Sequence, residues 1–212
     1  MHYKKLHQRF AGIAFLSALL VASGCSEPAG TKMPKYKQNP SPQDQYDLTI
    51  VVDNAPGPFA SVQGAMQYDI SNRDCLPPAE GLSVAQTTPI SSFIPIALKR
   101  VNETTFEGII ALDGLVDEDY FGHGVCHFRP IGPSFSLKAT GASGETKFVA
   151  SRWAEDFEFD PQGTTYYLRS SYPKHQKISD YPDVGAGSPE EYKESLRGDL
   201  FSVSITARKV QQ

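Results

Sequence analysis

The most regular pattern of hydrophobic and polar positions in this chain lies near its C-terminus, in residues 199–210. The hydrophobic side chains of Phe201, Val203, Ile205 and Ala207 occupy every second position, and serine or threonine stands between them. Successive side chains of a β-strand point to opposite faces of a sheet. The alternation therefore predicts a strand with one buried and one exposed face.

Similar patterns recur along the chain and predict a mainly β protein. Runs rich in β-branched and aromatic residues are separated by segments rich in Gly, Pro, Asn and Asp. Pro130 and Pro133 indicate that one strand is bent or lies at a sheet edge. Short strands at this spacing favour a single two-sheet antiparallel β-sandwich, immunoglobulin-like or transthyretin-like. The predicted strands are residues 46–53, 61–70, 94–101, 104–114, 124–141, 147–153, 164–172 and 199–210.

At most one short helix is expected, near residues 188–197. Ser188 is a favourable N-cap, Pro189 suits the first helical position, and Gly198 suits the end of a helix. Acidic residues in the first turn and Arg197 in the last turn complement the helix dipole.

The first 24 residues have the organisation of a signal peptide. Three basic residues precede the apolar run AGIAFLSALLVA. Twelve residues rise only about 18 Å as a helix, which is too short to cross a bilayer. No second apolar run of this length follows, so no membrane-spanning segment is expected in the mature chain.

The end of this segment, Val21-Ala22-Ser23-Gly24-Cys25, resembles the lipobox of bacterial lipoproteins. The resemblance implies cleavage before Cys25 and attachment of lipid to its thiol. Several acyl chains such as palmitate on one residue would anchor the protein stably in a membrane. Ser26 rather than Asp follows the cysteine, which in enteric-type lipoproteins implies transport to the outer membrane, with the protein facing the periplasm.

Residues 26–45 contain four prolines and little to bury, so they are expected to form a disordered tether after Cys25. Residues 46–210 are long enough for one β-sandwich domain with its own core.

Charge indicates what kind of partner this domain would bind. Removal of residues 1–24 takes away three of the 20 lysines and arginines and none of the 24 acids, which leaves a formal charge of about −7. Nucleic acid is a poor candidate partner because phosphate contacts require a clustered positive surface. A protein with a basic surface is favoured instead.

With Cys25 attached to lipid, Cys75 and Cys126 remain as an even pair in the oxidising periplasm, and a disulfide between them is expected. Closing a loop of about 52 residues would stabilise the fold by about 4 kcal/mol in the chain-entropy model.

The segment DEDYFGHGVCH, residues 117–127, carries the densest chemistry in the chain. His123, Cys126 and His127 have zinc-ligand chemistry, but the two histidines would lie about 13 Å apart on a strand and Cys126 has a better partner in Cys75. The acids, with Asp113, could ligate calcium, but their spacing does not match an EF-hand.

We therefore interpret this segment as a docking surface and expect no metal or other cofactor. Aromatic rings surrounded by negative charge suit the anchoring of a basic protein surface. The predicted partner-binding residues are Asp117, Glu118, Asp119, Tyr120 and Phe121. Residues 155–160, where Phe157 and Phe159 alternate with acids, are a second candidate.

No recognised catalytic string is present, and we expect a protein that is not an enzyme. Ser170 and Lys174 form an S-x-x-K string, but Pro173 breaks the helix that would bring them together. The carboxylates of residues 155–160 could serve a glycosidase, although a sequence alone does not establish their separation. An enzyme acting on peptidoglycan or lipid stays open as a third class of function.

The strings MQYDISNRDCLPP and DEDYFGHGVC, each with one cysteine, make the chain similar to uncharacterised periplasmic lipoproteins of Gram-negative bacteria. Some of these act as immunity proteins of secreted antibacterial effectors. The resemblance implies an immunity-type inhibitor that acts by protein–protein contact. The alternative is a structural or assembly lipoprotein of the envelope or of a secretion machine.

Overall fold

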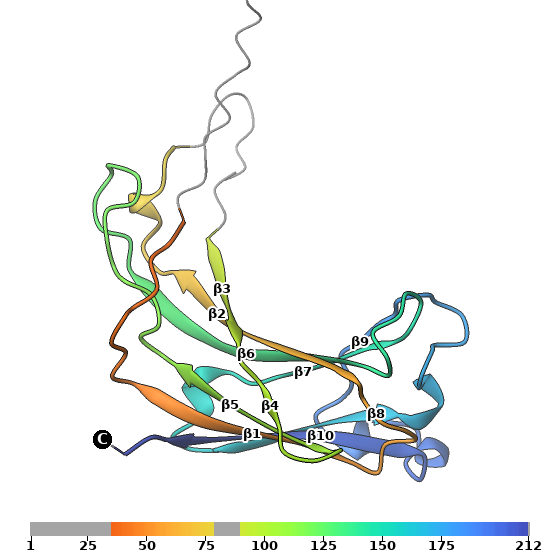
Figure 1. The fold of residues 1–212 in the computed structure, drawn as a ribbon. Coiled ribbons are helices and arrows are strands. Elements are labelled where there is room, and N and C mark those ends of the chain that lie inside the picture. Colours follow the sequence, from red (N-terminus) through yellow and green to blue (C-terminus); the bar gives the residue numbers. More distant parts are fainter. Residues whose placement is uncertain (1–34, 79–89, 212) are drawn as a thin grey trace, which may run out of the picture. The chain divides into compact units, whose positions relative to one another are not determined.

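The computed structural model describes residues 35–78 and 90–211, which form two five-stranded sheets packed face to face (Figure 1). The predicted β-sandwich is therefore confirmed. The first sheet has the order β4-β5-β1-β10-β8 and the second has the order β3-β2-β6-β7-β9. All pairs are antiparallel except the short parallel pair of β7 with β9. The strands are β1 Gln45–Asp53, β2 Ser61–Ile70, β3 Ser91–Ile96, β4 Lys99–Arg100, β5 Thr105–Ala111, β6 Phe128–Lys138, β7 Lys147–Ser151, β8 Gln162–Leu168, β9 Pro182–Asp183 and β10 Leu200–Lys209.

Most of these strands coincide with the runs predicted from the sequence, with two differences. The run 94–101 is divided into β3 and β4, because the chain passes from one sheet to the other at Ala97 and Leu98. The two-residue strand β9 was not predicted, since a pair so short leaves no periodic pattern.

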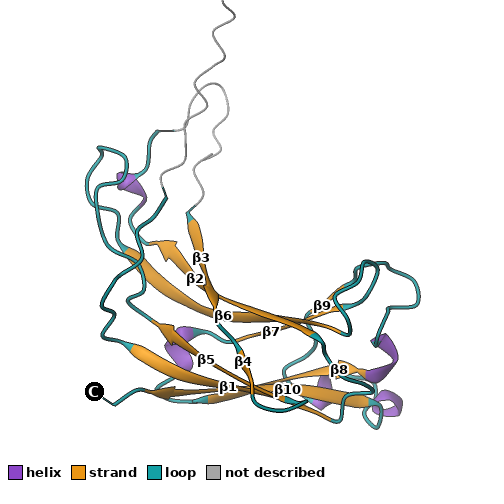
Figure 2. Ribbon diagram, viewed as in Figure 1, coloured by secondary structure: helices purple, strands orange, loops and turns teal. Residues whose placement is uncertain are grey.

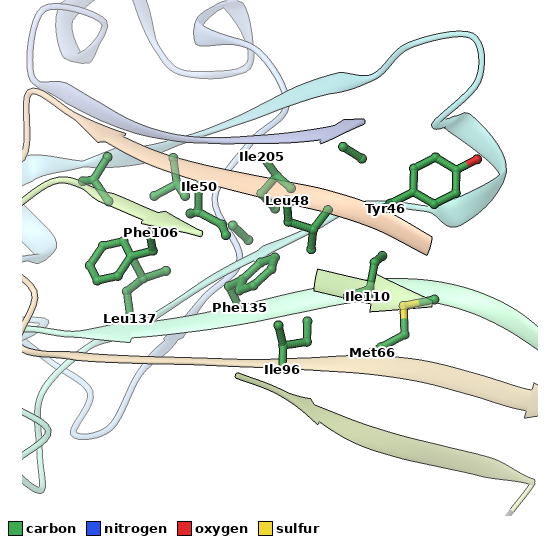
Figure 3. Close-up of a cluster of buried hydrophobic side chains, with 14 of the residues drawn as sticks. Tyr46, Leu48, Ile50, Met66, Ile96, Phe106, Ile110, Phe135, Leu137 and Ile205 are labelled. Carbon is green, nitrogen blue, oxygen red and sulfur yellow. The ribbon is translucent and has the colours of Figure 1, made fainter. Parts of the chain in front are cut away.

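The core lies between the sheets, and β1 and β10 supply its centre (Figure 3). In β10 buried and half-buried positions alternate from Phe201 to Ala207, as the sequence pattern predicts. Leu48, Ile50 and Val52 of β1 are buried beside them. Facing them from the second sheet are buried side chains that include Met66 and Phe135.

Two buried tyrosines also join the sheets by hydrogen bonds. Tyr68 of β2 donates its hydroxyl to the carbonyl of Ala111 in β5 at 2.5 Å. Tyr167 of β8 donates to the carbonyl of Val149 in β7 at 2.7 Å. Each sheet thus provides one phenol that satisfies a backbone acceptor of the opposite sheet.

The proline-containing strand β6 is not an edge strand, since it lies between β2 and β7. Of the two predicted possibilities, it is therefore the bent strand. Pro130 and Pro133 face Tyr68 and Met66 of β2, and the register shifts by a bulge between these two positions. Gly132 lies in this irregular stretch with φ +149°, and a Cβ there would lie 1.9 Å from the carbonyl oxygen of Arg152. The strand therefore requires glycine where the chain after β7 approaches it.

Near residues 188–197, where at most one short helix is expected, no α-helix forms. Ser188 caps the segment as predicted and Glu191 completes a capping box, but only two 3-10 turns follow, Pro189–Glu191 and Glu194–Leu196 (purple in Figure 2). Tyr192 between them is extended, and Lys193 is not helical either, with φ −54° and ψ 139°. The Tyr192 hydroxyl donates to the Tyr166 carbonyl at 2.7 Å, so attachment to β8 competes with helical continuation.

The predicted tether is shorter than expected at its C-terminal end, because residues 35–44 are joined to the β5–β6 connection. The backbone amide of Asn39 donates to the carbonyl of Gly114 at 2.9 Å, and that of Val116 donates to the carbonyl of Lys37 at the same distance. Asp113 in turn accepts from the amides of Gln43 and Asp44. Polar composition alone did not reveal these long-range bonds.

The predicted signal peptide, the lipidated Cys25 and the first part of the tether lie outside the described residues. Within the described ranges no helix is long and apolar enough to cross a membrane.

The intersheet phenols give a test of the fold. We expect Tyr167→Phe to lower the free energy of unfolding by about 1–2 kcal/mol at pH 7, because the half-buried carbonyl of Val149 loses its donor. Burial raises the pKa of Tyr167, so this contribution is full below the ordinary tyrosine pKa of about 10 and is lost as the pH rises above it. Urea denaturation at pH 7 and at alkaline pH measures both effects.

Tyr181→Phe is the matched control, since the structure assigns its hydroxyl no hydrogen bond among the described residues. If Tyr167→Phe and Tyr181→Phe changed stability equally, the intersheet hydrogen bond would contribute nothing.

Candidate functional site

The connection between β5 and β6, which contains the segment predicted to bind a partner, folds back on itself around a disulfide. Cys75 in the 3-10 turn Arg73–Cys75 is bonded to Cys126, with Cα atoms 5.2 Å apart. The amide of Cys126 donates to the carbonyl of Glu118 at 3.0 Å. Both cysteines are buried, together with Ile70 and Leu76, in a small apolar cluster separate from the main core. The predicted disulfide is confirmed.

The three acids of this segment form bonds within the chain. Asp117 accepts from the amide of Phe128 at 2.9 Å and contacts His127 Nδ1 at 2.8 Å. Glu118 forms an ion pair with Lys37 at 2.6 Å. Asp119 accepts from the amide of Gly122 at 2.6 Å. Each carboxylate therefore helps to hold the shape of the loop.

Desolvation opposes the ionisation of Asp119, but the donated amides of Gly122 and Phe121 outweigh it and lower the pKa of this carboxyl below its usual range. Asp119 is therefore negatively charged throughout the neutral range.

The two rings of the segment are half-buried rather than free. Tyr120 packs edge-on against Tyr36 with ring centroids 5.1 Å apart, and its hydroxyl donates to the carbonyl of Val116 at 2.7 Å. Phe121 packs on the apolar cluster of the disulfide. The expectation of free rings at a loop tip is not met here, and contact of residues 117–121 with a partner stays a prediction.

Freely exposed rings lie instead in residues 152–161, which connect β7 to β8 and are named the acidic–aromatic loop below. Trp153 is 60% exposed and Phe159 is 89% exposed. Glu155, Glu158 and Asp160 beside them are exposed as well. The sequence pattern identified Phe159 and these acids, but it missed Trp153, which was assigned to the end of a strand.

The middle of the acidic–aromatic loop packs on the core of the sandwich through one side chain. Phe157 is buried and its ring lies 5.3 Å from that of Tyr46, at the start of β1. Short turns surround it, since Phe157 donates to the carbonyl of Ala154 and Asp160 donates to that of Asp156. Phe157 and Phe159 both alternate with acids in the sequence, yet they point to opposite environments.

Both ends of the acidic–aromatic loop are also held. The amide of Arg152 donates to the carbonyl of Pro133 at 3.1 Å, and the amide of Ala207 donates to that of Pro161 at 2.8 Å. The guanidinium of Arg152 reaches across the loop to Asp160, with Nη1 and Oδ2 3.3 Å apart. It lies over Gly163, where a Cβ would be 2.2 Å from Nη1. The exposed rings are thus carried by a braced loop, which lowers the entropy lost on binding.

The two acidic segments flank the same end of the sandwich. The amide of Leu112, which precedes the disulfide connection, donates to the carbonyl of Asp44. Phe157 of the acidic–aromatic loop packs on Tyr46, two residues further along the chain. Among the acids at this end, Asp44 is paired with Lys209 at 2.9 Å.

Metal binding has no support from the geometry of the described residues. Across residues 35–78 and 90–211, no group of three or more His, Cys, Asp and Glu side chains is arranged to hold an ion. Cys126 is used in the disulfide, and the Asp113 carboxylate accepts backbone amides of residues 43 and 44.

Comparison with protein-family models, with curated proteins and with solved structures gives no match. The function is therefore argued from the surface of this chain.

The disulfide gives the test of this region. We expect the double variant Cys75→Ala/Cys126→Ala to lower the free energy of unfolding by about 4 kcal/mol, because the unfolded chain is no longer cross-linked across a separation of 51 residues. Denaturant unfolding of the purified chain measures the loss.

Limited proteolysis of the double variant would show which part of the chain loses stability. Residues 113–128 should be cleaved first, because their rings pack on the cystine, whereas the acidic–aromatic loop should stay resistant. Equal cleavage of both loops would contradict a local role for the disulfide.

Proposed function

We propose that this protein is a lipid-anchored periplasmic lipoprotein, attached to the outer membrane through Cys25, that binds and blocks a secreted antibacterial effector. The inhibition is of the immunity type: it occurs by protein–protein contact and requires no chemistry by this chain. Support for the compartment comes from the signal peptide and lipobox of residues 1–25, and a disulfide between Cys75 and Cys126 agrees with it.

The observation that carries the proposal is the pair of exposed rings, Trp153 and Phe159, among acids on a braced loop. A few residues, often Trp, Tyr and Arg, carry most of the binding energy of protein interfaces, and Trp153 is an exposed side chain of this kind. The surrounding carboxylates favour a basic partner and speed its association. Residues 117–121, at the same end of the sandwich, extend the negative surface.

A deletion strain tests the proposal directly. Cells that lack the gene should be killed by kin or neighbouring bacteria that deliver effectors to the periplasm, and a copy of the gene should restore survival. Survival without the gene equal to that of the parent would reject an immunity role. A structural lipoprotein would instead co-purify with an envelope partner from membranes of unchallenged cells.

The binding loop is tested by Trp153→Ala/Phe159→Ala in the full-length gene. Loss of two anchoring rings costs about 2 kcal/mol each at an interface, or roughly a thousandfold in affinity. We expect the variant to reach its normal level in the membrane with its disulfide intact, but to protect cells poorly. Competition survival and immunoblotting measure both properties.

Val184→Ala is the matched control, since Val184 is 68% exposed and lies outside the acidic–aromatic loop. Reversal of charge by Glu155→Lys/Glu158→Lys should weaken protection as well, by repelling a basic partner. Full protection by both loop variants would place the binding surface elsewhere.

A further inference from the structure

The edges of the two sheets differ in how well they are protected from pairing with another strand. β4 and β9 have two residues each, and β4 consists of Lys99 and Arg100. The edge of β8 is covered, because Tyr166 and Ala186 exchange backbone hydrogen bonds of 2.8 and 2.9 Å. Short length, charge and a covering segment are three ways to prevent edge pairing. β3, with six residues, has none of them among the described residues.

The unpaired backbone groups of β3 follow from its register with β2. Ile70 donates its amide to the carbonyl of Ile90 at 2.8 Å, and hydrogen-bonded pairs alternate along an antiparallel ladder. The groups of Ser92 and Ile94 therefore bond to β2, and those of Ser91, Phe93 and Pro95 point away from it. No described residue hydrogen-bonds to these outward groups.

The strand at this edge is uncharged and mostly apolar. Residues 90–98 contain no acid and no base. Phe93 is 59% exposed, and Ile109 of β5, near the same edge, is 61% exposed. Phe93 and Pro95 line a groove of about 590 Å³ that has no charged residue in its lining. Ile109 lines a neighbouring groove of about 600 Å³ whose lining also includes charged residues: Asp47, Lys99, Glu107 and Arg208. Exposed apolar side chains thus accompany free backbone donors and acceptors.

We propose that a second copy of this chain pairs with β3, edge to edge and antiparallel, so that one sheet continues through both copies. The register that overlaps all of residues 90–96 puts Phe93 on the two-fold axis, opposite its own copy. Both outward amides then find acceptors: Phe93 bonds to Phe93 of the other copy, and Ser91 donates to the carbonyl of Pro95. The missing N–H of Pro95 falls at the end of the pairing, where its loss matters least.

The distribution of charge favours a second copy of this chain as the partner of β3. Residues 35–212 contain 16 lysines and arginines and 23 acids, a formal charge of −7, so two copies repel each other wherever acids meet. Residues 90–98 form an uncharged edge at which they can approach, and every cross-strand pair of this register joins serine, proline or apolar residues. A basic partner is drawn instead to the acidic–aromatic loop. Such a two-fold contact is self-complementary, as isologous dimers require, and it does not depend on the proposed function.

The test is Phe93→Cys in the full-length protein, expressed in cells that export it. Residues of a hydrogen-bonded pair have Cα atoms about 5.5 Å apart, which a disulfide can bridge. We expect non-reducing electrophoresis to show a band of twice the chain mass that disappears on reduction. Val184→Cys, at 68% exposure, is the matched control and should stay at the single mass. Cys75 and Cys126 are buried and bonded to each other, and Cys25 is present in both variants, so no native cysteine accounts for a difference between them.

A second variant, Phe93→Lys, puts like charges opposite each other at the axis. Light scattering of the detergent-solubilised chains should give twice the protein mass for the native sequence and the single mass for this variant. Linkage of Phe93→Cys no greater than that of Val184→Cys would overturn the proposal. Linkage to a different protein, or a double mass that persists in Phe93→Lys, would overturn it as well.

Discussion

The burial of one apolar face of β1 and β10 against the second sheet is the constraint on which the rest of the structure depends. These strands are neighbours at the centre of the first sheet, and their inward side chains include Leu48, Ile50, Val203 and Ile205, all essentially inaccessible to solvent. Burial of such side chains contributes roughly 1.5–3 kcal/mol each. The two tyrosine hydroxyls that cross between the sheets then satisfy backbone acceptors in an otherwise apolar layer.

A rigid sandwich explains why exposed rings can be kept in place on loops. Phe157 extends the core outward to the acidic–aromatic loop through its contact with Tyr46, and Arg152 ties the two ends of that loop together. The connection with the disulfide is held differently, by a small apolar cluster around the cystine. In both places apolar contacts hold the chain, and the carboxylates accept backbone amides, pair with basic side chains such as Lys37 and Arg152, or face solvent.

The two proposed contact surfaces have opposite chemistry. The acidic–aromatic loop combines rings with negative charge, whereas the β3 edge combines an aromatic ring with unpaired backbone groups and no charge. A basic protein would gain electrostatic attraction at the loop. A second acidic copy would avoid repulsion at the edge, because residues 90–98 carry no charge. Under the two proposals one domain uses both surfaces at the same time, because the acidic–aromatic loop and the β3 edge share no residue.

The sequence by itself determined the class of fold, the positions of nearly all the strands and the pairing of Cys75 with Cys126. These follow from local patterns: a period of two along each strand, and a count of cysteines. Only the tertiary structure decided which acidic–aromatic segment presents its rings. Tyr120 and Phe159 both follow acidic residues in the sequence, yet Tyr120 packs on Tyr36 from the predicted tether. Phe159 is exposed, because Phe157 of the same loop is the ring that packs on the core. Burial depends on contacts between residues that are distant in sequence, and a periodic pattern carries no information about those contacts.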